Sequence, residues 1–168
     1  MGWLLGDTRK AVWSAARAHG VRYGSATRLS FPDACADVIY ACHMLEHLSR
    51  AASARFFDEC RRVLVPGGTL RIVVPDLALA VCTYDHDGDA DALVERLMLA
   101  DERRGIRKVI RFNGHRWMYD GDSLRGRLED TGFQDVVVLP AGETTIDDPG
   151  ELNLREREED SVYVEARR

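Results

Sequence analysis

Residues 31–77 decide the fold, and their sequence is FPDACADVIYACHMLEHLSRAASARFFDECRRVLVPGGTLRIVVPDL. Residues 37–41 form a short β-branched and aromatic run, which predicts a buried strand. The apolar residues after Ser49 recur at helical spacing, which predicts a helix that ends at Pro66-Gly67-Gly68. Residues 69–74 predict a second buried strand. Strand, helix and strand within about forty residues indicate a βαβ unit with parallel strands.

Further helices are predicted on both sides of this unit. Residues 8–19 carry apolar side chains on one side and basic side chains on the other, as amphipathic helices do. Residues 89–102 predict another helix, whereas residues 105–119 show no clear period and are expected to form a loop. The positions of the second helix expected to face the core are Leu93, Leu97 and Ala100.

The C-terminal part of the chain predicts one short helix and an antiparallel hairpin. Asp122 or Ser123 is expected to cap a helix that ends just before Gly132. Residues 136–139 predict a strand, and residues 162–166 alternate apolar and polar side chains with the period of a half-buried strand. The 168 residues are therefore expected to form a single α/β domain.

Composition and charge exclude several classes of protein. With 45% hydrophobic and 30% charged residues, the chain has the composition of a globular domain. The formal net charge of −5 and the scattered basic residues argue against a nucleic-acid partner. No apolar stretch approaches the roughly 20 residues that span a bilayer, so no membrane association is expected. The four cysteines lie far apart, which predicts reduced thiols and a cytoplasmic location.

The order of motifs in residues 31–77 closely resembles the middle of class I S-adenosylmethionine-dependent methyltransferases of the type-11 group. The matching motifs are an F-P-D turn, a D-V-x-Y strand, an L-E-H segment, a helix ending in R-R-V-L-x-P-G-G, and a strand. Downstream, HRWMYD, LEDTGF, and N-L-R-x-R followed by SVYVEA resemble the end of one bacterial branch of that group. The resemblance covers residues 24–168, with residues 1–23 as an atypical N-terminal segment. It implies a partial Rossmann-like three-layer sandwich, with a mainly parallel sheet and a C-terminal antiparallel hairpin.

The resemblance implies that S-adenosylmethionine is bound and that its methyl group passes to an oxygen, nitrogen or carbon nucleophile of a small molecule. In the family the cofactor lies beyond the carboxyl ends of the strands. The residues expected beside the cofactor are Ser25, Ala26, Ala41 and Cys42. His43 and His47 are candidates for a general base or an orienting group, because imidazole titrates near neutrality, and each could instead serve structure alone. The candidates for substrate contact are His115, Trp117 and Tyr119, although Trp117 could instead cap the core.

Two departures from the family's pattern concern the cofactor. Members begin with a strand that leads into a glycine-rich G-x-G loop, and neither Gly2 nor Gly6 forms such a loop before Phe31. Ser25 stands where the family often has an aspartate that accepts a hydrogen bond from the adenine amino group, and a hydroxyl lacks that charge. Cofactor binding is therefore expected to be weakened. The alternative is a truncated fold that does not methylate and acts as a binding or scaffold subunit, or catalyses a different reaction.

The resemblance also has a consequence for assembly. The first strand of the family pairs with the strand equivalent to residues 37–41, so the lack of that strand would expose the edge of a hydrophobic strand. We expect that edge to be covered by residues 1–23, by a second copy in a homodimer, or by a partner protein.

Two patterns resemble metal sites, but no metal is expected from the sequence. Residues 43–47 read H-x-x-E-H, in which two histidines on one helix face would bind zinc, yet no third ligand is evident. The aspartates of residues 85–91 resemble the start of an EF-hand loop. That pattern then fails, because Ala90 replaces the required glycine and Arg96 replaces the bidentate glutamate.

Overall fold

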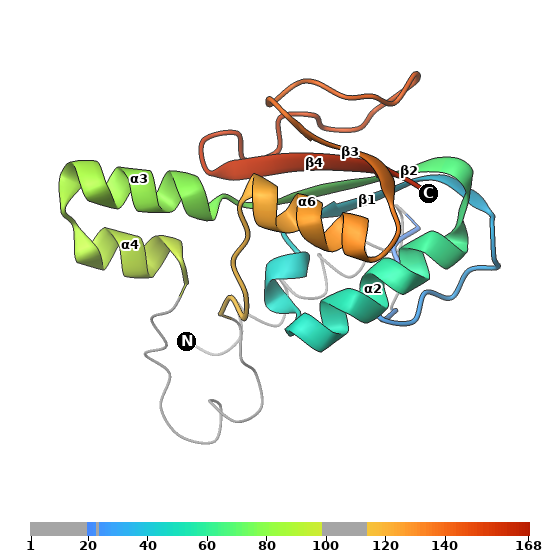
Figure 1. Ribbon diagram of the computed structural model, residues 1–168, viewed down its shortest axis with the longest axis horizontal. Coiled ribbons are helices and arrows are strands. Elements are labelled where there is room, and N and C mark those ends of the chain that lie inside the picture. The colour runs from blue at the N-terminus through green and yellow to red at the C-terminus, as the bar shows by residue number, and fades with distance from the viewer. Residues whose placement is uncertain (1–19, 23, 99–113) are drawn as a thin grey trace, which may run out of the picture.

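The computed structural model describes residues 20–22, 24–98 and 114–168, so the helix predicted for residues 8–19 lies outside the described residues. The described chain forms a four-stranded sheet in the order β1-β2-β4-β3 (Figure 1). The strands are β1 (Ala36–Cys42), β2 (Leu64–Pro75), β3 (Gln134–Leu139) and β4 (Ser161–Arg167). The helices are α2 (Arg50–Val63), α3 (Leu77–Asp87), α4 (Ala90–Arg96), α6 (Gly121–Asp130) and the short 3-10 helix η1 (Leu45–His47).

β1, α2 and β2 form the predicted βαβ unit. The two strands are parallel, and α2 begins after Ser49, whose hydroxyl accepts a hydrogen bond from the N–H of Ala52. The helix ends at Val63, before the Pro66-Gly67-Gly68 segment that was expected to end it. That segment instead lies inside β2, where the pairing with β1 is irregular and Gly67 has a φ of 80°.

β4 lies between β2 and β3 and is antiparallel to both. The predicted hairpin of β3 and β4 is therefore confirmed, and so is the α/β, Rossmann-like class. The expectation of a mainly parallel sheet is wrong for the described residues. β1 and β2 are parallel, whereas β4 pairs antiparallel with both β2 and β3.

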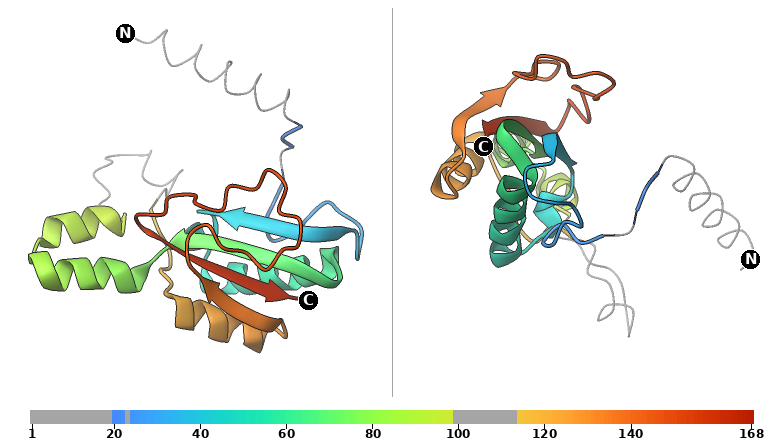
Figure 2. Two further views of the ribbon diagram at one scale, coloured as in Figure 1. Left: turned by 90° about the horizontal axis from the view of Figure 1, so that it is seen from above. Right: turned by 90° about the vertical axis from the view of Figure 1, so that its right-hand side faces the viewer.

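The prediction that β4 is half-buried is wrong. Its outward positions are covered as well, since Tyr163 is 2% exposed and Glu165 is 1% exposed. The cover is the connection of residues 140–160, which runs along the face of the sheet opposite α2 and α6 (Figures 1 and 2). Tyr163 anchors that connection, because its hydroxyl donates a hydrogen bond to the carbonyl of Glu156.

The main hydrophobic core lies between the sheet and the helices α2 and α6. These helices contribute the buried side chains Phe56, Phe57, Cys60, Leu124 and Leu128. The cap of α6 is Asp120, and not Asp122 or Ser123 as expected. The Asp120 carboxylate accepts from the N–H of Ser123, and the Ser123 hydroxyl accepts from the N–H of Asp120. Gly132 follows the helix with a φ of 89°, as predicted.

α3 and α4 form a helical hairpin that projects from one end of the sheet (Figure 1). α3 was not predicted, and Ala80 is its buried residue. α4 begins after its cap Asp89, but Leu93 and Leu97 are half-buried and do not reach the main core, because the hairpin stands clear of the sheet. Ala100 lies outside the described residues.

No described helix has the length and apolar character that crossing a membrane requires. The cysteines at positions 35, 42, 60 and 82 are free thiols.

Candidate active site

The carboxyl end of β1 leads directly into the candidate site. Ala41 is buried and Cys42 half-buried in the strand, and burial raises the pKa of the Cys42 thiol. The next residue, His43, still donates its backbone N–H to the carbonyl of Val73 in β2, at 2.9 Å. Its φ of 45° is a left-handed conformation that residues other than glycine rarely adopt. This bend turns the chain out of the sheet and into η1.

His43 is held in one orientation by polar groups on both sides of its ring. The Arg157 guanidinium lies 2.9 Å from Nδ1, and arginine only donates, so Nδ1 is the acceptor. Nε2 therefore carries the hydrogen and donates it to the Ser161 hydroxyl at 2.9 Å, which in turn donates to Asp160 at 3.0 Å. Burial lowers the pKa of His43, and the charge of Arg157 lowers it further. His43 is therefore a neutral imidazole in a fixed orientation. Its Nδ1 lone pair accepts the hydrogen bond from Arg157.

Glu46 is the most buried charged group of the site, with 1% exposure. Its carbonyl accepts from the N–H groups of Arg116 and Trp117, which fixes η1 against residues 114–118. Neither carboxylate oxygen has a hydrogen-bond partner in the described part of the chain. The nearest ring nitrogens are His43 Nδ1 at 3.5 Å and His47 Nε2 at 3.8 Å. Burial raises the pKa of Glu46, because an ionised carboxylate without partners is costly away from water.

His47 and His115 lie edge to face, with ring centroids 5.2 Å apart and planes at 65°. His47 Nδ1 is 3.3 Å from the carbonyl of Gly114, which leaves Nε2 facing Glu46. His115 is 7% exposed, its Nδ1 lies 3.2 Å from the Met118 sulfur, and burial lowers its pKa. The ligand atoms of Glu46, His47 and His115 all lie within 4.8 Å of one another. This group contains Glu46 and His47 of the H-x-x-E-H pattern together with His115, and it does not include His43.

A groove of about 670 Å³ opens beside this cluster. It is lined by Ser49, Arg50, His115, Arg116 and Trp117. Trp117 is 43% exposed, and the Arg50 guanidinium lies 4.5 Å from the centroid of its ring, in cation–π geometry. Tyr119, the remaining residue predicted to contact substrate, is fully buried in the hydrophobic core and does not line this groove.

A second groove, of about 630 Å³, lies along residues 20–31. Its lining contains Ser25 and Ala26, but not Ala41 or Cys42. The wall of this groove is tied to α2 by Arg62, which donates to the carbonyls of Leu29 and Phe31. Among the described residues, the four predicted cofactor contacts are therefore divided between this groove and the end of β1.

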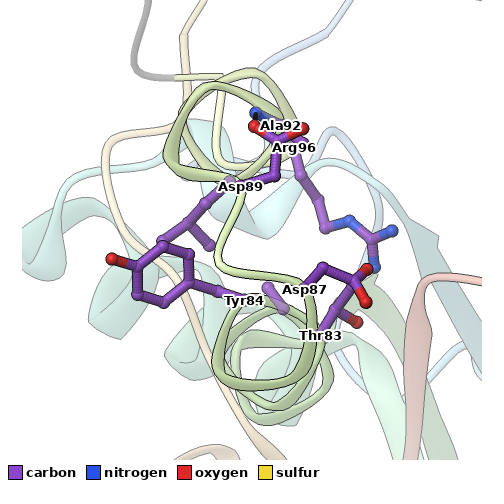
Figure 3. Close-up of a pocket in the computed structure, with 8 residues that line it drawn as sticks. Thr83, Tyr84, Asp87, Asp89, Ala92 and Arg96 are labelled. Carbon is purple, nitrogen blue, oxygen red and sulfur yellow. Dashed lines mark hydrogen bonds between the residues drawn. The ribbon is translucent and has the colours of Figure 1, made fainter.

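A third, much smaller pocket lies between α3 and α4 (Figure 3). Thr83, Tyr84 and Asp87 of α3 face Asp89 and Arg96 of the α4 segment across it. Its volume of about 30 Å³ has room for water but not for an organic ligand. This pocket is not a candidate active site.

Two residues of the site were not singled out from the sequence. Glu46 lies within L-E-H and Arg157 ends N-L-R-x-R, so both belong to motifs that carry the family resemblance. The motifs mark both residues as part of the resemblance to the family. They do not indicate that the two residues meet, because Glu46 and Arg157 are more than a hundred positions apart in sequence. Their shared contact with His43 depends on the tertiary fold.

Part of this chain is similar to known proteins. Residues 6–72 match the family described as a methyltransferase domain. A curated Mycolicibacterium smegmatis protein, described as "Probable S-adenosylmethionine-dependent methyltransferase", is 39% identical over 56 residues, which are 33% of this chain and 21% of that protein. This chain thus spans about a fifth of the length of that relative.

Solved structures share the fold at low sequence identity. A SAM-dependent methyltransferase from Thermotoga maritima has a TM-score of 0.56 at 16% identity, over 90% of this chain and 66% of that one. One from Methanosarcina mazei has a TM-score of 0.54 at 19% identity, over 88% and 66% of the two chains. Residues 6–72 are therefore similar to a methyltransferase domain, and the chain shares its fold with solved methyltransferases.

Proposed function

We propose that this chain binds S-adenosylmethionine and supports transfer of its methyl group to an oxygen, nitrogen or carbon nucleophile of a small molecule. The observation that carries the proposal is the end of β1, where a parallel βαβ unit delivers His43 and η1 to the ligand-binding edge expected of such sheets. The family match over residues 6–72 supports the same chemistry. The net charge of −5 favours a small molecule over nucleic acid, and the free thiols favour a reducing, cytoplasmic setting.

Two separate places in the described chain support cofactor binding. The groove at Ser25 and Ala26 has the volume of a small-molecule site, and its serine offers a hydroxyl acceptor. Ala41 and Cys42 are small residues at the end of β1, where a ligand can approach the backbone closely. S-adenosylmethionine supplies an electrophilic methyl group when it is bound. The protein's contribution is mainly to position the two reactants.

His43 and His47 have different roles in this proposal. The neutral ring of His43 is fixed by Arg157 and Ser161, which favours an orienting role, and it can accept a proton at Nδ1 when Arg157 moves away. The side chain of His47 is 41% exposed, which gives it access to an acceptor molecule. His115 and Trp117 line the groove of about 670 Å³ and form its contact surface for the substrate.

Calorimetric titration with S-adenosylmethionine and S-adenosylhomocysteine tests this proposal. We expect micromolar binding, about 8 kcal/mol. Ser25→Asp should tighten binding and Ser25→Ala should weaken it, because a carboxylate accepts a stronger hydrogen bond than a hydroxyl. Thr83→Ala, which removes a hydroxyl on α3 outside this groove, is the matched control and should leave binding unchanged. An absence of heat at millimolar ligand would contradict the proposal.

A second candidate function is that of a binding or scaffold subunit that does not methylate. The observation that favours it is the position of β1, which has β2 as its one partner strand among the described residues. A solved structure with a TM-score of 0.52 and 14% identity is a complex between the Haloferax volcanii Trm112 methyltransferase activator and a methyltransferase, so one neighbour of this fold does bind a partner. For this chain, the partner would be a second copy in a homodimer or another protein along β1. A mass above that of the monomer, with no cofactor binding, would favour this function.

A further inference from the structure

The buried carboxylate of Glu46 has no hydrogen-bond partner among the described residues, although it is 1% exposed. Native proteins rarely leave such a group unsatisfied, because desolvation without compensation is costly. The adjacent His43 does not compensate it, since its Nδ1 accepts from Arg157 and has no hydrogen to donate. A cation that binds at this carboxylate would compensate it.

The groups around Glu46 are metal ligands. His47 Nε2 faces the carboxylate at 3.8 Å, and His115 brings a second imidazole from a segment far away in sequence. We propose that Glu46, His47 and His115 bind a divalent transition-metal ion of the zinc type. Two imidazoles and one carboxylate are a donor set used by catalytic zinc sites, whereas calcium and magnesium prefer oxygen ligands throughout.

The geometry requires only small movements for binding. The three ligand atoms lie within 4.8 Å of one another. Tetrahedral zinc with metal–nitrogen distances of about 2.0–2.1 Å needs donors roughly 3.4 Å apart. Side-chain rotation can close that difference, because His47 is exposed on one side and Glu46 already lies 3.8 Å from its Nε2.

Outer contacts orient both histidines, as they do in known metal sites. The carbonyl of Gly114 lies 3.3 Å from His47 Nδ1, which directs the lone pair of Nε2 toward Glu46. His115 is held by its edge-to-face contact with His47 and by Met118. Three protein ligands leave a fourth position for water or for an oxygen of a bound molecule. The groove that His115 shares with Trp117 gives access to the cluster.

The test is metal binding by the full chain after treatment with a chelator. We expect one equivalent of Co²⁺ to produce the visible absorption of a tetrahedral site, Zn²⁺ to displace it, and Zn²⁺ to raise the midpoint of thermal unfolding. Glu46→Gln and His115→Asn each remove a proposed metal ligand and should weaken Co²⁺ binding strongly. The loss in affinity should exceed the roughly 10–100-fold loss that follows removal of a residue that only hydrogen-bonds to a ligand. Circular dichroism of each variant reports whether it is folded.

His86→Asn is the matched control, since His86 is a surface histidine on α3 with an 87% exposed side chain. It should bind Co²⁺ as the unmodified chain does. The proposal is overturned if the folded chain gives no Co²⁺ absorption, if folded Glu46→Gln binds as tightly as the original, or if His86→Asn loses binding equally. None of these measurements uses S-adenosylmethionine, so the metal site and the proposed methyl transfer can fail separately.

Discussion

Arg71 and Glu165 form a buried ion pair between two neighbouring strands. They are 0% and 1% exposed, lie opposite each other in the β2–β4 register, and approach to 2.6 Å. Glu165 also accepts hydrogen bonds from the hydroxyls of Thr144 and Thr145. Arg71 donates to the carbonyl of Glu143. The pair therefore fixes the 140–160 connection to the sheet.

Glu165→Gln is expected to lower the free energy of unfolding by about 3–5 kcal/mol near neutral pH, because Arg71 would stay buried without its carboxylate. Burial raises the pKa of Glu165, but the hydrogen bonds from Thr144, Thr145 and Arg71 outweigh it and lower the pKa overall. The carboxylate therefore stabilises the fold above the unfolded pKa of about 4.3, and this stability is lost as the pH falls through the folded pKa.

Denaturant unfolding at a series of pH values measures this effect. The difference between Glu165→Gln and the unmodified chain should shrink as the solution becomes acidic. Glu158→Gln is the control, since the pair of Glu158 with Arg155 is 45% and 65% exposed and should contribute under about 1 kcal/mol. A Glu165→Gln variant as stable as the control variant would show that the pair does not hold the connection.

At the scale of elements, the sequence predicted the helices and strands in which the spacing of apolar residues coincides with the face that is buried. α2 was predicted because Phe56, Phe57 and Cys60 repeat at helical spacing and all pack against the sheet. α3 was missed because Ala80 is its one residue in the buried class, so no periodic stripe marks it. β4 was assigned an exposed face because Glu165 is charged, and periodicity does not show that a distant loop covers that face.

Asp120→Ala tests the N-terminus of α6. It removes one half of a reciprocal capping box and should cost about 1 kcal/mol of unfolding free energy. Asp122→Ala should cost less, because the Asp122 side chain is 93% exposed and interacts mainly with the helix dipole and Arg125. Thermal or denaturant unfolding of both variants measures the two losses of unfolding free energy. A larger loss for Asp122→Ala would favour the cap position expected from the sequence.

At the scale of the whole molecule, the described sheet has β1 at one end. The N–H group of His43 donates to the carbonyl of Val73 in β2, and the pairing is regular from Val38 to Cys42. N–H groups at alternate positions of β1, including that of Val38, therefore point away from β2. The sequence resemblance predicted this edge. The sequence does not predict that η1, residues 114–118 and residues 157–161 meet at one site. Residues 114–118 and 157–160 lie in loops, and loops have no periodic pattern from which their positions could be inferred.

Association along β1 is expected to give a particle of roughly twice the 18.9 kDa monomer mass. Val38→Pro removes an edge N–H without removing a bond to β2, so it should shift the protein toward monomer. Val38→Ala keeps that N–H and should still associate. Light scattering after size-exclusion chromatography measures the masses. A monomeric unmodified chain, or equal association of both variants, would rule out pairing along β1.

The central position of β4 in the sheet constrains the order in which the strands can pair during folding. β3 has β4 as its one partner strand in the described sheet, and β2 has one edge open until β4 arrives. Synthesis proceeds from the N-terminus, so a ribosome must release residues 161–167 before these two strands can be joined. During that interval the nascent protein carries open hydrogen-bonding edges on both strands, and a chaperone that shields them would have most effect before the last described strand emerges.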